Sequence, residues 1–312
     1  RYLYIAIRGT DGYVAKPADA GTDVFAMDTG NGSSTIPTFD SGFPADMSLV
    51  RNRYDGSTSN WELGSRLLGS KFVYPNLTNS EATSGKYHWD SNQGVHTSAS
   101  GEYNSDSFAW MWKRGQGFDA VAYTGDGVAG RAITHSLSTT PEMIWLRSRS
   151  HTNPWMVYHK GLDGGSSPQD KYMVLNTDAA ETDASVIWND TAPSTTNFTV
   201  GSHSYVNADT YTYIAVLFAS VTGISKIGSF TGNGTSQSIS LGFQPRFLIL
   251  KNATSTEKWY VLDTVRGWNS TSDAYMSLNT DYAQVSSNIF GEPTATGFDI
   301  SGSDNWNNAN GE

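Results

Sequence analysis

The residues of this sequence that could perform chemistry are its histidines and carboxylates, because it contains no Cys and so offers no thiol nucleophile, thiolate ligand or disulfide. The histidines are His88, His96, His135, His151, His159 and His203. We single out His151 and His159 for their spacing, and we expect this pair to flank a solvated strand edge. Neither a G-x-S-x-G nor an H-E-x-x-H pattern is present. We predict no catalytic residues and no metal ligands.

Four Asp residues in polar turns are candidates for a structural Ca²⁺ site, namely Asp126, Asp178, Asp190 and Asp281. No Ca²⁺-loop motif surrounds them, and turn formation is the role that we expect. A carboxylate pair for glycoside hydrolysis is defined by separation in space, so spacing in the sequence does not identify one. No cofactor is predicted.

The composition of the 312 residues bounds the partners and the fold class. Lys and Arg number 20 against 30 Asp and Glu, a net charge of -10, which leaves no surplus of cations to bind the phosphates of a nucleic acid. No stretch approaches the roughly 18 apolar residues of a membrane helix. Charged residues are only 16% and aromatics reach 12%, a balance that favours short strands and polar turns over long helices.

The elements that would position these residues follow an internal repeat. The turn at residues 123–127 recurs at 230–234 and, more loosely, at 28–32. Downstream of each turn, after a hydrophobic strand, comes a second strand around a single Trp, at Trp61, Trp155 and Trp259. A fixed position in a repeat usually holds a packing residue, so we predict that these three are core anchors.

We predict three repeats, at residues 23–114, 115–220 and 221–312, preceded by a strand at 1–8 and a linker at 9–22. The first copy is divergent. The third copy stops before the strand that ends the second copy.

The missing strand lies at the other end of the chain. Its residues are Tyr2, Leu3, Tyr4, Ile5, Ala6 and Ile7, which align with residues 211–216. If Glu312 is written directly before Arg1, the end of the third copy and this strand together match the end of the second copy without a gap. Because a sheet that lacks a strand exposes unpaired backbone groups, three arrangements are open: the sequence is part of a longer array, the strand folds back onto the third repeat, or it pairs with a neighbouring molecule. We expect the first as the simplest.

The strand pattern predicts an all-β protein. Alternating apolar residues, β-branched and aromatic side chains, and turn residues about every ten positions are typical of antiparallel sandwiches. We predict a tandem array of three antiparallel, jelly-roll-like β-sandwich repeats, with the N-terminal strand belonging to the pattern of a preceding or neighbouring copy.

These residues resemble a known repeat. The segments that carry the resemblance are 108–114, 117–127, 141–147, 155–161 and 188–193. They are similar to an uncharacterised β-domain found in tandem in large virion and tail-fibre proteins of marine cyanophages and related tailed phages. The resemblance implies a non-enzymatic structural or receptor-contacting module on a virion surface, and it supplies no catalytic residues.

We therefore expect an extracellular, tail-fibre-like appendage that serves as a spacer and as an adhesin for host cell-surface polysaccharide. We expect it to form a homo-oligomer or a self-polymer and to contact other virion proteins. Exposed aromatics outside the repeat positions are the expected glycan platforms, and Trp89, Trp268 and Trp306 fit that description. One alternative is a self-polymerising filament or capsid-decoration subunit joined through residues 1–8. Another is a polysaccharide depolymerase.

Overall fold

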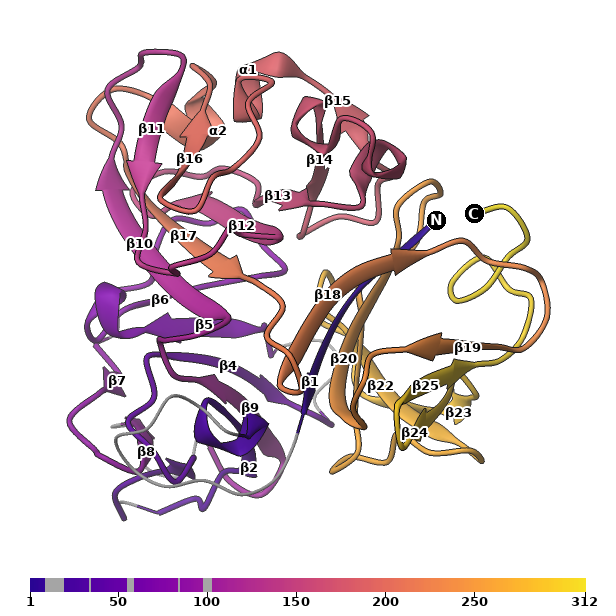
Figure 1. The fold of residues 1–312 in the computed structure, drawn as a ribbon. Coiled ribbons are helices and arrows are strands. Elements are labelled where there is room, and N and C mark those ends of the chain that lie inside the picture. The colour runs from indigo at the N-terminus through magenta and orange to yellow at the C-terminus, as the bar shows by residue number, and fades with distance from the viewer. Residues whose placement is uncertain (9–19, 34, 55–58, 84, 98–102) are drawn as a thin grey trace.

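Antiparallel strands are the main secondary structure of the chain (Figure 1). The computed structural model describes residues 1–8, 20–33, 35–54, 59–83, 85–97 and 103–312, so most of the predicted linker lies outside the described residues. The all-β class with several antiparallel sheets is confirmed. The finer prediction of three jelly-roll-like sandwiches in tandem is not confirmed, and the sheets lie as follows.

We group the elements into three units. The elements of unit one are η1 (Gly21–Asp23), β2 (Phe25–Thr29), β3 (Phe39–Asp40), β4 (Met47–Asn52), β5 (Glu62–Ser65), η2 (Arg66–Leu68), β6 (Phe72–Val73), β7 (Tyr87–His88), β8 (Gly94–Thr97) and β9 (Ser107–Trp112). Unit two contains β10 (Phe118–Thr124), β11 (Arg131–Thr134), β12 (Met143–Ser148), β13 (Met156–His159), η3 (Leu162–Gly165), η4 (Pro168–Asp170), β14 (Lys171–Val174), β15 (Thr182–Asp183), α1 (Ser185–Trp188), β16 (Asn197–Val200), α2 (Ser204–Asn207) and β17 (Thr212–Phe218). Unit three contains β1 (Tyr2–Arg8), β18 (Ser225–Phe230), β19 (Gln237–Ser240), β20 (Pro245–Asn252), β21 (Tyr260–Asp263), β22 (Asp273–Ser277), β23 (Val285–Asn288), β24 (Gly291–Thr294) and β25 (Gly297–Ile300).

Each unit has one large and one small sheet. The large sheets have the orders β2-β9-β4-β5-β6, β10-β17-β12-β13-β14-β15 and β18-β1-β20-β21-β22-β23. The small sheets are β3-β8-β7, β11-β16 and β19-β25-β24. Strand β1 therefore takes the place in unit three that β9 and β17 take in the other units.

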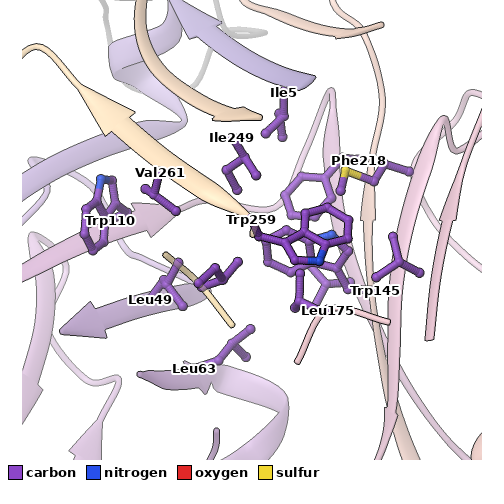
Figure 2. Close-up of a cluster of buried hydrophobic side chains, with 14 of the residues drawn as sticks. Ile5, Leu49, Leu63, Trp110, Trp145, Leu175, Phe218, Ile249, Trp259 and Val261 are labelled. Atoms are coloured by element: carbon purple, nitrogen blue, oxygen red, sulfur yellow. The ribbon is translucent and has the colours of Figure 1, made fainter. Parts of the chain in front are cut away.

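The three large sheets share one hydrophobic core, which we call the central cluster. It contains residues from all three units, among them Leu49, Trp145 and Ile249 (Figure 2). The opposite face of each large sheet packs into a separate cluster of its own unit. Because both faces are buried, the large-sheet strands read as continuous apolar runs such as β20, in which Ile249 faces the central cluster and Leu250 faces the cluster of unit three.

The three predicted core anchors are buried in the central cluster, which confirms that part of the prediction. Trp61, Trp155 and Trp259 are exposed by no more than 1%. Their indole nitrogens also join the units in a cycle. Trp61 of unit one donates to the Ser277 carbonyl of unit three at 2.9 Å. Trp155 of unit two donates to unit one, at the Tyr74 carbonyl, and Trp259 of unit three donates to unit two, at the Val174 carbonyl.

Buried cations repeat the same cycle. Arg51, Arg147 and Lys251 are each exposed by 1% or less. Arg51 donates to the Tyr282 carbonyl at 3.1 Å, and Arg147 and Lys251 likewise donate to backbone carbonyls of units one and two. Hydrogen bonds to charged donors are stronger than neutral ones, so these side chains stabilise all three junctions.

Strand β1 pairs within its own chain, between β18 and β20. The expectation that it belongs to a preceding or neighbouring copy is therefore corrected: it completes unit three, the second of the three arrangements considered. The two chain ends lie side by side (Figure 1), since Thr254 Oγ1 accepts from the Arg1 amine at 2.9 Å and donates to the Glu312 carboxylate.

The register of β1 differs by two residues from the sequence alignment. Tyr2 pairs with Phe230 and Asn252, just as Tyr213 pairs with Tyr123 and Ser148. Tyr2 is therefore equivalent to Tyr213 and not to residue 211. A shift of two residues keeps every side chain on the same face of the strand, so apolar alternation alone does not fix this register.

Candidate functional site

Two of the three predicted glycan platforms are not exposed. Trp89 is 8% exposed in the cluster of unit one, and Trp268 is 3% exposed in that of unit three. Trp306 is half-buried, and its ring packs at 4.3 Å from that of Phe290. The expectation of exposure is wrong for Trp89 and Trp268 because each unit has a core of its own, which recruits aromatics outside the repeated positions.

His151 and His159 do not share a solvated strand edge. His151 is exposed and stacks on Tyr211, with ring centroids 3.3 Å apart, whereas His159 is completely buried. The expectation of a shared solvated edge is therefore wrong for His159. Its Nδ1 accepts a hydrogen bond from the Gly161 amide at 2.9 Å.

A polar pocket of about 410 Å³ lies in unit one. We call it the unit-one pocket. Its lining residues are Val50, Arg51, Asn52, Ser59, Asn60, Glu62, Tyr74, Lys86, Tyr103 and Ser107. They come from β4, β5 and β9, from the segment that follows β6, and from the segments that precede β5, β7 and β9. A hollow of this size falls in the range of about 300–1,000 Å³ that is typical of small-molecule sites.

Glu62 organises the floor of this pocket. Its carboxylate accepts from Lys86 Nζ at 2.6 Å, from the Tyr103 hydroxyl at 2.6 Å and from the Tyr87 hydroxyl at 2.8 Å. Burial, followed by the nearby Glu62 charge, raises the pKa of Tyr87 well above its usual value, so this phenol stays protonated and donates. Three donors on one carboxylate hold the Lys and Tyr side chains in fixed positions.

In units two and three, other residues occupy the space that corresponds to the unit-one pocket. In unit two the side-chain amide of Asn153, which is equivalent to Ser59, donates to the Ser204 carbonyl of α2, and Val206 of α2 is fully buried. In unit three Trp306 packs against Tyr260, which is equivalent to Glu62, with ring centroids 6.0 Å apart. Among the described residues of unit one, no helix or tryptophan covers Glu62 in this way. The pocket residue Glu62 itself differs from its equivalents, which are Met156 in unit two and Tyr260 in unit three.

A second hollow, of about 340 Å³, lies on the small sheet of unit three. We call it the unit-three pocket. Glu292 and Asp299 face each other there as directly paired residues of β24 and β25. The Asp299 carboxylate accepts from the Ser238 hydroxyl at 2.5 Å. Like charges on directly opposed residues destabilise a sheet.

The chemistry of the unit-one pocket suits a polyhydroxylated ligand. Amide, hydroxyl and ammonium groups can donate to or accept from sugar hydroxyls, and the Tyr74 and Tyr103 rings offer apolar surface. Sequence reasoning missed this site. The signal available was Glu62 itself, a charged residue directly after the repeated Trp, where the other copies have Met156 and Tyr260.

In the described part of the chain, no group of three or more His, Asp or Glu side chains is arranged to hold a metal ion. None of the helices placed there is long and apolar enough to cross a membrane.

Fold and site together define an all-β protein of three large sheets around one core, with a polar pocket in one unit. A family model for a domain of unknown function, DUF7483, matches residues 22–312, and the chain belongs to this family. The match includes everything described except residues 1–8, 20 and 21. No curated protein and no solved structure matches the chain.

Proposed function

We propose that this chain is a non-enzymatic binding module that attaches to a cell-surface polysaccharide through the unit-one pocket. The observation that supports this most is the polar lining of the unit-one pocket, in which Glu62 accepts from Lys86, Tyr87 and Tyr103. The wider setting, a tail-fibre-like appendage on an extracellular virion surface beside other virion proteins, rests on the sequence resemblance.

A rigid frame suits such a role because a preformed pocket binds with little loss of conformational freedom. The pocket floor is held by the Glu62 hydrogen bonds, and the sheet beneath it belongs to the central cluster. Sugars present hydroxyls at fixed spacing, so fixed donors and acceptors select among them.

Filling the pocket tests the proposal. The full chain is applied to a glycan array, beside Ser59→Trp, which places an indole at the rim of the unit-one pocket. The matched control, Ser238→Trp, makes the same replacement in the unit-three pocket. We expect the Ser59 variant to lose binding at least tenfold and the Ser238 variant to bind as the unmodified chain does, with both folded by circular dichroism. No bound glycan, or equal binding by the Ser59 variant, would overturn the proposal.

A polysaccharide depolymerase is the second candidate, favoured only by Glu292 and Asp299 in the unit-three pocket. Glycosidases use two opposed carboxylates, and these two residues are cross-strand partners. This candidate predicts turnover of a labelled polysaccharide that is lost in Glu292→Gln and in Asp299→Asn. If the full chain cleaves none of a range of capsular polysaccharides, this candidate is contradicted.

A further inference from the structure

Two histidines face each other on the small sheet of unit one. His88 of β7 is directly paired with His96 of β8, and their ring centroids lie 5.8 Å apart with planes inclined by 32°. Both rings are half-buried. The adjacent pair, Tyr87 and Thr97, is 1% and 3% exposed, so packing fixes the positions of the two strands.

The separation of 5.8 Å suits a shared ion. Two imidazoles on one ion, with metal–nitrogen bonds of about 2.0–2.1 Å at a tetrahedral angle, have centroids roughly 5 Å apart. Small side-chain rotations therefore bring the two rings of this pair to bonding distance without a change in the backbone pairing.

A hydrogen bond already orients one ring. His96 Nδ1 lies 2.9 Å from Thr38 Oγ1, and Thr38 is 3% exposed. Thr38 Oγ1 also accepts from the Thr97 amide at 3.0 Å and from the Thr97 hydroxyl at 3.3 Å. These contacts hold Thr38, and with it the ring of His96, in place. Metal-binding histidines commonly have such a partner on the second nitrogen.

A negative charge lies near the pair. Asp90 interacts electrostatically with His96, and a nearby carboxylate favours a cation beside the two rings.

We propose that His88 and His96 form a two-histidine site for a borderline transition-metal ion such as Zn²⁺ or Cu²⁺. Imidazole nitrogen suits these ions, and Cu²⁺ binds such ligands most tightly in the divalent series. With two ligands from the protein, the remaining positions on the ion are open to water or to a group of another molecule. The site is independent of the unit-one pocket.

The experiment uses the full chain at pH 7.5, titrated with CuCl₂ by calorimetry and followed by electron paramagnetic resonance. We expect one saturable site with two equatorial nitrogen ligands, and at least a tenfold loss of affinity in His88→Gln and in His96→Gln. His151→Gln, which changes an exposed histidine outside the pair, is the matched control and should bind as the unmodified chain does.

Zn²⁺ provides a second readout. It should raise the thermal unfolding midpoint of the unmodified chain and of His151→Gln, but not of the two variants in the pair. The proposal is overturned if the unmodified chain shows no saturable binding, or if His88→Gln and His96→Gln, shown to be folded by circular dichroism, retain its affinity.

Discussion

His159 is a neutral histidine enclosed at the junction of unit two with β1. Its Nδ1 accepts from Gly161, whose carbonyl accepts from Arg1 at 2.8 Å. Burial, assisted by Lys160, lowers the pKa of His159 to about 3. In the unfolded chain the pKa is about 6.5. The unfolded state therefore binds more protons between these values, and stability falls as the pH drops from 6.5 toward 3.

The first prediction follows from this loss of stability at low pH. Between pH 7 and pH 5 the unfavourable protonation of His159 should remove about 2 kcal/mol from the free energy of unfolding. His159→Gln keeps an acceptor for the Gly161 amide but does not titrate, so it should lose less over the same interval. Urea unfolding at the two pH values measures both. An equal loss in the two proteins would contradict the assignment.

The second prediction concerns the indole that joins units three and two. Trp259→Ala should cost about 3–5 kcal/mol of stability. Trp259→Phe keeps most of the ring but removes the 3.2 Å hydrogen bond to the Val174 carbonyl, which still accepts from Thr177. We expect this change to cost about 0.5–1.5 kcal/mol. Trp306→Phe, at a half-buried position, is the control and should cost less than Trp259→Phe. Urea unfolding at pH 7 compares the three variants, and equal costs would show that this hydrogen bond does not matter.

At the scale of elements, β1 is the strand that completes unit three. Leu3 and Ile5 face the central cluster, whereas Tyr2 and Tyr4 face the cluster of unit three. Ile5→Ala should therefore cost about 2–5 kcal/mol. Tyr4→Phe in the same strand removes only a hydroxyl and should cost much less. Thermal and urea unfolding measure both, and a harmless Ile5→Ala would show that β1 is not part of the core.

The pairing of β1 also predicts the mass of the protein in solution. Because the strand occupies its own chain's groove, the purified chain should have the mass of one copy, 33.9 kDa, by size-exclusion chromatography with light scattering. Multiples of that mass that disappear when residues 1–8 are deleted would instead support a filament joined by strand exchange.

The sequence predicts the strands better than it predicts their partners. The apolar runs, the Trp at 61, 155 and 259 and the unpaired character of residues 1–8 are local or periodic signals. The partner of β1 depends on contacts across more than 200 residues, for example Tyr2 with Phe230. The burial of Trp89 and Trp268 was missed for the same reason, since a side chain's exposure depends on which sheet covers it.

The two candidate sites show the same limit. Glu62 departs from the repeat and can be noticed in the sequence, but its contacts with Lys86 and Tyr103 follow from strand pairing and loop position. His88 and His96 are eight residues apart, a spacing without meaning until β7 and β8 pair. His151 and His159 have the same separation and are not brought together.

At the scale of the whole molecule, the three units share the central cluster and a cycle of junctions. Three independent domains would unfold separately. We expect a single transition by calorimetry, with equal calorimetric and van't Hoff enthalpies. Separate transitions for the units would contradict the shared core.

The central structural claim is that β1 closes this cycle from within the chain, and hydrogen exchange followed by mass spectrometry tests it most directly. Amides of residues 2–7 should exchange as slowly as those of β17, its equivalent in unit two, because both strands are paired on two sides. Exchange of residues 2–7 at the rate of a free peptide, while β18 and β20 stay protected, would contradict the account.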